Sequence, residues 1–387
     1  MESRKRGKMN RTLSGHGLYL LHFTHNKELS EFYVSIALRF LALSMIGIFI
    51  PIFLLYEIAL PLSLVLYFFM AFAFFFIFSS LLAAYISARI GFKHLILLSV
   101  PFQISFILLL ALLENFRIPL FLIAAAGAIA SGFYWIGHHA DLAKFTKKKK
   151  RASQVGLSFF VVGVSALIGP IVGGLLLTEF SYVVLFVVTS VLLLLSTIPL
   201  FFTKDFYQRV PFSARDVFRG NKARDALAFM GQGIEIGTLG VLWPIFIFSL
   251  LGAYFALGLV GTFGALMSSV ASIIIGRVAD KVGRKNVLRV GAYSLSVLWF
   301  FRTLVSSASH VFLVTIFSFV TDIAGLPMDS VSYTKAHYSK SPTGYLVFRE
   351  IFINIGKIIA YVFMLLAGSF IATFIFTGAA QALLLLF

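Results

Sequence analysis

Residues 47–53 have the sequence GIFIPIF, and residues 240–246 have the sequence GVLWPIF. The two stretches share a glycine, a proline, an isoleucine and a phenylalanine at matching positions, and they lie 193 residues apart in a chain of 387. Other pairs keep nearly the same offset: Gly91 with Gly283, His138 with Asp329, and Gly163 with Gly356. An offset close to half of the length predicts that one structural unit has been duplicated.

Both copies consist of long apolar runs. Hydrophobic residues make up 60% of the chain and charged residues only 12%, whereas soluble domains carry about 25% charged residues. A helix needs about 20 mostly apolar residues to cross a bilayer. Twelve segments qualify, at residues 31–57, 61–88, 93–114, 118–143, 152–178, 181–203, 223–250, 253–276, 286–306, 309–332, 344–367 and 369–387. Their hydrophobicity is continuous rather than alternating, which is typical of helices and not of barrel strands. We therefore predict an all-α integral membrane protein with twelve transmembrane helices in two pseudo-symmetric six-helix bundles.

The cations predict the orientation. The net charge is +17, and the Lys and Arg residues cluster in the tail and in every second connection, while the other connections hold only Arg117. By the positive-inside rule, both termini are cytosolic in a multi-pass protein of the plasma membrane. The expected organisation is a basic tail at 1–30, a first bundle at 31–203, a central cytosolic loop at 204–222 and a second bundle at 223–387. The lipid bilayer then accounts for the basic charge, and no nucleic acid is expected as a partner.

Several functions are excluded by what the sequence lacks. No long polar segment leaves room for a catalytic domain, so we do not expect an enzyme, and no cofactor is indicated. The phosphate-binding pattern G-x4-G-K-[ST] does not occur, so energy would come from an ion or substrate gradient instead of ATP. His138 and Asp141 share a helix face, but His139 points about 100° away, and no metal site is expected.

The stretch at 276–285, GRVADKVGRK, carries the strongest local motif. Its glycines permit a tight turn, and Asp280 can accept charge-assisted hydrogen bonds from Arg284. The motif residues are Gly276, Asp280, Lys281, Gly283, Arg284 and Lys285. They resemble the G-x-x-x-D-[RK]-x-G-R-[RK] loop of the major facilitator superfamily, and the resemblance implies a cytosolic latch that holds the outward-facing state. In the first-half counterpart Ala88 stands where the acid would be, so the latch is expected in the second half alone.

A second motif lies in the fifth apolar segment. It comprises Gly156, Ser165, Gly169, Pro170, Gly173 and Gly174. The spacing is similar to the G-x8-G-x3-G-P-x2-G-G signature of proton-coupled antiporters in the same superfamily, with Ser165 in place of the middle glycine. That resemblance implies proton-coupled export, although the fourth segment lacks the Arg that such antiporters usually carry. The alternative is a helix whose small residues only permit close packing.

Ionisable and polar residues inside the apolar segments are the candidates for substrate binding or ion coupling, because each is expensive to place in a membrane. They are Arg39, Trp135, His138, Gln232, Glu235, Asp322, Glu350, Asn354 and Lys357. The first, fourth, seventh and tenth helices line the cavity in the superfamily, which implies that Arg39, His138, Glu235 and Asp322 face the substrate path. Arg302, near an outer helix end, is expected to snorkel. For His139, Asp329 and Arg349, near the cytosolic boundary, a structural role weighs as much as a functional one.

Together these observations predict a secondary active transporter that moves a small molecule by alternating access, with proton-coupled export. Glu235 and Asp322 are the expected proton carriers, and Lys357 is their candidate partner. The protein is expected to be monomeric. The alternative is a transporter-like membrane protein with a receptor or assembly role and no transport.

Overall fold

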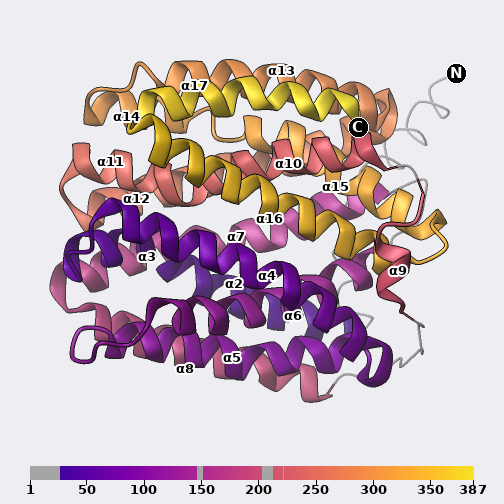
Figure 1. Ribbon diagram of the computed structural model, residues 1–387, viewed down its shortest axis with the longest axis horizontal. Coiled ribbons are helices and arrows are strands. Elements are labelled where there is room, and N and C mark those ends of the chain that lie inside the picture. Colours follow the sequence, from indigo (N-terminus) through magenta and orange to yellow (C-terminus); the bar gives the residue numbers. More distant parts are fainter. Residues whose placement is uncertain (1–26, 146–150, 203–211, 221) are drawn as a thin grey trace, which may run out of the picture.

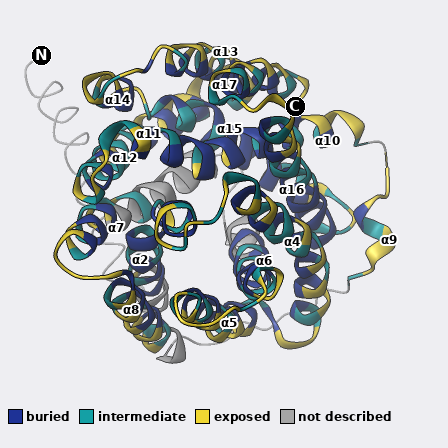
Figure 2. Cartoon of the chain, turned by 60° about the vertical axis from the view of Figure 1, so that its left-hand side comes forward, coloured by how far each residue is buried: buried dark blue, intermediate teal, exposed yellow. Residues whose placement is uncertain are grey.

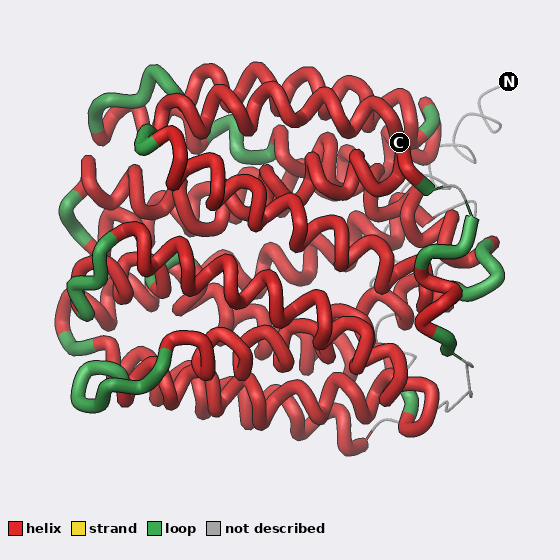
Figure 3. Tube along the Cα trace, in the orientation of Figure 1, coloured by secondary structure: helices red, strands yellow, loops and turns green. Residues whose placement is uncertain are grey.

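The chain forms a bundle of long helices that run side by side (Figure 1). The computed structural model describes residues 27–145, 151–202, 212–220 and 222–387, and these residues contain helices and loops but no strand (Figure 3). Almost all of the predicted basic tail and about half of the predicted central loop lie outside the described residues.

The first half comprises helices α2 to α8. Their bounds are α2 Lys27–Gly47, α3 Ile50–Ile52, η1 Phe53–Glu57, α4 Leu62–Ile90, α5 Phe92–Leu112, α6 Leu120–Phe145, α7 Arg151–Glu179 and α8 Tyr182–Phe202. The short helix α9, Ala214–Val217, follows. The first predicted span thus consists of three consecutive helical pieces, and its last piece is a π-helix that begins two residues after Pro51.

The second half comprises helices α10 to η4. Their bounds are α10 Ala223–Gly237, η3 Thr238–Leu242, α11 Trp243–Leu251, α12 Tyr254–Val282, α13 Arg284–Arg302, α14 Ala308–Thr315, α15 Val320–Tyr338, α16 Pro342–Ala367, α17 Phe370–Ala380 and η4 Gln381–Leu386. Within the described residues, ten helical segments are long and apolar enough to cross a membrane. The other two predicted spans are α13 and the shorter α17 with η4. The prediction of an all-α protein with twelve membrane helices is confirmed.

Helices pack mainly within their own half. In the first half, α2 packs on α7 and α8, and α6 packs on α4 and α5; in the second, α10 packs on α16 and α13 packs on α15. Two seams join the halves, α7 against α12 and α4 against α16. Polar side chains from the two halves can therefore lie next to each other along these seams.

The outer surface of the bundle is apolar. Viewed toward the helix ends, buried residues face inward and exposed residues face outward (Figure 2). Large hydrophobic side chains such as Phe78, Leu194 and Tyr293 are about half exposed or more. Soluble proteins rarely expose such continuous apolar surface, whereas a bilayer requires it.

Two helix boundaries differ from the prediction. Residues 276–282 of the glycine motif continue α12 as helix, and the turn is made at Gly283, whose φ is +104°. Gly91 closes α4 in the same way with a φ of +85°, which only glycine adopts without strain. The tenth span is divided into α14 and α15, and α15 continues to Tyr338, beyond the predicted end at residue 332.

We call the end of the bundle that carries Arg89, Lys281 and Lys340 the basic end, and the other end the opposite end. Helices α4, α12 and α15 finish at the basic end, and α5, α13 and α16 start there. The last residue, Phe387, also lies there, because its backbone oxygen accepts a hydrogen bond from Nζ of Lys285 over 3.1 Å.

Candidate functional site

A cavity of about 240 Å³ lies mostly in the second half, between η3, α11, α12, α13, α14 and α15, and Ile48 of the first half also lines it. Its wall is mostly apolar and includes Trp243, Pro244 and Val260. Polar lining comes from Arg302, from the hydroxyls of Ser268 and Ser318, and from two threonines. Most lining positions belong to the portions of these helices nearer to the opposite end, so the cavity lies on that side of the bundle.

Arg302 lies in the protein interior and does not snorkel. Its side chain is only 2% exposed, and its guanidinium carbon lies 4.2 Å from the ring centre of Trp299 and 5.0 Å from that of Trp243. Its Nε and Nη1 have no hydrogen-bond partner in the described part of the chain. Position near a helix end suggested snorkelling, but the two tryptophans hold the cation by cation–π contacts instead.

The acids predicted to carry protons lie beside this cavity. Glu235 is 8% exposed and lies within electrostatic range of both Arg302 and Asp322. Asp322 lies beside Ser268, which lines the cavity. One oxygen each of Glu235, Asp322 and Gln232 has no hydrogen-bond partner among the described residues. A carboxylate oxygen that is buried without a hydrogen-bond partner is energetically costly.

A second polar cluster joins both halves closer to the basic end. Arg349 on α16 donates from Nη2 to Oδ1 of Asp329 on α15 over 2.6 Å and from Nη1 to Oε1 of Glu350 over 2.5 Å. Nη1 also lies 2.9 Å from Nε2 of His139, which belongs to α6 in the first half. Nδ1 of His139 lies 2.7 Å from the hydroxyl of Tyr333. We call these five residues the inter-half network.

The inter-half network is inaccessible to solvent. None of its members is more than 7% exposed. Nε2 of His139 also lies 3.3 Å from Oε1 of Glu350, so this nitrogen faces both the guanidinium and the carboxylate, while Nδ1 faces Tyr333. Buried charges of both signs thus meet with most of their hydrogen-bonding groups satisfied, which is the arrangement in which a buried ion pair holds helices together.

Three other predicted residues adjoin this network. Nδ2 of Asn354 donates to the backbone oxygen of Glu350 over 2.8 Å, and Nζ of Lys357 donates to Oδ1 of Asn354 over 3.2 Å. Nζ of Lys357 also lies 5.4 Å from the ring centre of Phe76 on α4, across the seam between the halves. The ring of Trp135 stacks on that of His139 at 5.2 Å. The polar stripe of α16 therefore belongs to the junction of the halves and not to the cavity wall.

Sequence reasoning underestimated His139, Asp329 and Arg349, and it missed Tyr333. All four lie inside the inter-half network. The sequence did contain a signal for this cluster. Asp329 and Tyr333 are four residues apart on one helix face, and Arg349 follows on the next helix.

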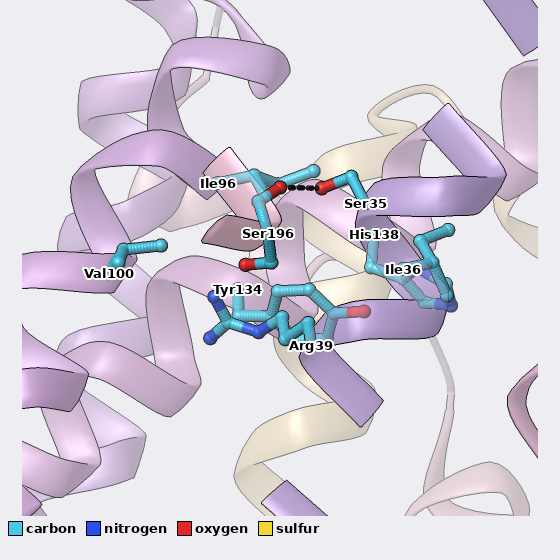
Figure 4. Close-up of a pocket in the computed structure, with 8 residues that line it drawn as sticks. All are labelled: Ser35, Ile36, Arg39, Ile96, Val100, Tyr134, His138 and Ser196. Atoms are coloured by element: carbon cyan, nitrogen blue, oxygen red, sulfur yellow. Dashed lines mark hydrogen bonds between the residues drawn. The ribbon is translucent and has the colours of Figure 1, made fainter. Parts of the chain in front are cut away.

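Arg39 and His138 form a third polar group, inside the first half. With Tyr134 they line a small pocket between α2, α5, α6 and α8 (Figure 4). The structure thus divides the predicted site residues into three groups: the second-half cavity, the inter-half network and this first-half pocket.

The predicted latch residues lie at the basic end. Nη2 of Arg284 donates to Oδ1 of Asp280 over 3.1 Å, and Nη1 donates to the hydroxyl of Thr334 on α15 over 3.2 Å. Gly276 is buried within α12, and Lys281 is exposed. Asp280 and Arg284 thus connect α12, α13 and α15.

The glycine motif of α7 lies where three helices meet. A Cβ on Gly173 would come within 2.2 Å of the backbone oxygen of Met45 on α2, and one on Gly174 within 2.8 Å of the backbone oxygen of Tyr254 on α12. A Cβ on Gly169 would meet Ser44 at 1.9 Å, and Pro170 faces Gly258 of α12. Glycine is therefore required for close helix approach on both sides of α7. The side chains of the remaining motif positions, Gly156 and Ser165, lie outside the described residues.

Comparisons with known proteins agree with this architecture. The sequence profile of the Major Facilitator Superfamily matches residues 32–223. A protein of Bacillus subtilis (strain 168), the uncharacterized protein YqgE, is 26% identical over 266 residues, which cover 64% of this chain. The matched region spans about 61% of the length of that relative.

Two solved structures have the same fold. The human organic anion transporter MFSD10 (TETRAN) superposes with a TM-score of 0.70 at 14% identity, over 93% of this chain and 99% of that one. A bacterial homologue of the iron transporter ferroportin, in an outward-facing state, superposes with a TM-score of 0.67 at 13% identity, over 93% and 98%. At these identities the likeness concerns the fold.

Proposed function

We propose that this chain, which belongs to the major facilitator superfamily, is a secondary active transporter that moves a small molecule by alternating access. It is a multi-pass membrane protein of a transporter family. Proteins of related fold include a human organic anion transporter and a bacterial homologue of an iron transporter. We further propose that a proton is the coupling ion, that the direction is export, and that the protein lies in the plasma membrane with the basic end in the cytosol.

One observation carries the mechanism: the inter-half network joins α6 of the first half to α15 and α16 of the second, on the basic side of the cavity. Such a junction closes one route to the cavity as long as its ion pairs persist. At the opposite end, the hydroxyl of Tyr254 on α12 donates to Oε1 of Glu57 on η1 over 2.6 Å, and this bond is exposed. Alternating access requires breakable contacts at both ends, with residues 31–203 and 223–387 moving as the two halves.

Proton coupling is proposed for Glu235 and Asp322. Both acids adjoin the cavity and have an oxygen without a hydrogen-bond partner among the described residues. Protonation would remove a buried negative charge, and a change of access would return the group to water. We propose export by proton antiport because the α7 motif resembles that of antiporters, and its glycines pack against α12 across the seam.

The experiment uses the absence of cysteine in the chain. Single cysteines are introduced at Ser318, which lines the cavity, and at Ser332, which is buried on α15 beside the network. A membrane-impermeant maleimide is then added from either side of proteoliposomes of known orientation. We expect S318C to react from the extracellular side, and S332C to become reactive from the cytosolic side when Arg349→Gln is added. If S332C is as unreactive with Arg349→Gln as without it, the proposed gate is wrong.

A further inference from the structure

Arg39 places a positive charge inside the first half without a matching acid. Its side chain is 3% exposed, and its guanidinium carbon lies 4.0 Å from the ring centre of Tyr134. Nε and Nη1 have no hydrogen-bond partner, and no carboxylate of the described residues lies within ion-pair distance. The equally buried Arg349, in contrast, contacts two carboxylates and a histidine.

The pocket beside Arg39 is small. Its volume of about 10 Å³ is close to the space that one water-sized species occupies. Ser35 and Ser196 form part of its lining, and Oγ of Ser35 donates to the backbone oxygen of Ser196 over 2.6 Å (Figure 4). Aliphatic side chains of α2 and α5 complete the wall.

Three residues that line the pocket carry buried polar atoms without a partner. Besides the two nitrogens of Arg39, the hydroxyl of Tyr134 and Nδ1 of His138 are buried and have no partner among the described residues. Arg39 and Tyr134 supply N–H and O–H donors, and a His nitrogen can also carry a hydrogen. A buried group of donors around an uncompensated cation favours an anion, because an unpaired buried charge is costly.

We propose that this pocket binds one monatomic anion of halide size, with chloride as the physiological ligand, held by Arg39 and Tyr134. A water molecule would satisfy hydrogen bonds but would leave the charge of Arg39 unbalanced. The bound anion neutralises that charge and joins α2 to α6. This site is separate from the second-half cavity, and the proposal does not depend on transport or on its coupling ion.

The test compares thermal unfolding of the detergent-purified protein in sodium chloride, sodium bromide and sodium gluconate at equal ionic strength. We expect Tm to rise with chloride and bromide in a saturable manner, by roughly 2 to 4 °C over gluconate. Arg39→Gln should abolish the difference between chloride and gluconate. Arg302→Gln, which removes the buried arginine of the other cavity, should preserve it.

A second measurement remains decisive if Arg39→Gln does not fold. Crystals of the unmodified protein grown in bromide should give an anomalous difference peak at hydrogen-bonding distance from Nη1 of Arg39. In the thermal unfolding assay, Tyr134→Phe should raise the chloride concentration that is needed for half of the Tm rise. Equal Tm values in chloride and gluconate, a pocket that holds only water, or a bromide peak confined to Arg302 would each overturn the proposal.

Discussion

Arg349 on α16 and Asp329 on α15 are joined by a 2.6 Å hydrogen bond between Nη2 and Oδ1, and Nη1 of the same guanidinium reaches His139 on α6. The planar guanidinium thus contacts helices of both halves with its two terminal nitrogens. A lysine cannot reproduce this geometry, because its ammonium is a single point of charge.

Replacing Arg349 is therefore expected to destabilise the protein strongly. Arg349→Gln leaves Asp329 and Glu350 buried without their cation, and breaking a buried pair costs about 3 to 5 kcal/mol. Arg349→Lys should recover only part of this loss. The free energy of unfolding, measured by denaturant titration in detergent micelles, checks both variants.

The control for Arg349 is Lys340→Gln, which removes one positive charge from an exposed position at the same end. It should change the free energy of unfolding by no more than about 0.5 kcal/mol. Comparable losses of unfolding free energy for Lys340→Gln and Arg349→Gln would mean that stability depends on the net charge and not on the inter-half network.

Proton loading of Glu235 or Asp322 should make access to the cavity depend on pH. We expect the maleimide reactivity of S318C to differ several-fold between acidic and alkaline buffer, because protonation of Glu235 removes its attraction to Arg302. Glu235→Gln or Asp322→Asn should reduce this pH response. Glu179→Gln, at an exposed position at the end of α7, should leave it unchanged. A full pH response in both acid variants would exclude these acids as proton carriers.

The twelve helices could be predicted because apolar length and charge position are local properties of the sequence. Contacts between polar side chains could not, since they depend on helix rotation and on partners far away in the chain. Arg302 illustrates this: its place near a helix end suggested lipid-headgroup contact, yet Trp243, 59 residues earlier, covers it.

Glu350 illustrates the same limit. Spacing on α16 placed it in one stripe with Asn354 and Lys357, which is correct. Its main partner, however, is the adjacent residue Arg349. Neighbours on a helix point about 100° apart, and only the length of the arginine side chain lets the two groups meet. The helical continuation of α12 through residues 276–282 was missed because charged residues there resemble a loop.

Asp280 is predicted to stabilise the closed basic end. It accepts a hydrogen bond from Arg284, which also reaches Thr334 on α15. Asp280→Asn keeps the shape of the side chain but removes its negative charge, so its interaction with Arg284 weakens. We expect S332C to gain reactivity from the basic side, to a smaller extent than with Arg349→Gln. Lys281→Gln changes an exposed neighbour and should have no effect; an equal gain in both variants would contradict a specific latch.

Close contact between α10 and α16 predicts that Gly233 cannot be enlarged. A Cβ at Gly233 would lie 2.0 Å from the backbone oxygen of Ile353, and one at Gly356 would lie 2.2 Å from that of Met230. Backbone atoms on both sides cannot move aside as a flexible side chain would. Gly233→Ala should therefore destabilise the protein by about 1 to 3 kcal/mol.

Gly240 provides the matched control for this substitution, because it lies in the same membrane span and a Cβ there would have no atom within 4 Å. Gly240→Ala should be neutral or should stabilise by about 0.4 to 1 kcal/mol, since alanine restricts the unfolded chain. Thermal unfolding in one detergent at one protein concentration compares the two variants. If Gly233→Ala unfolds at the same temperature as Gly240→Ala, α10 and α16 do not pack at the distance described. The position of Glu235 beside the cavity must then depend on other contacts.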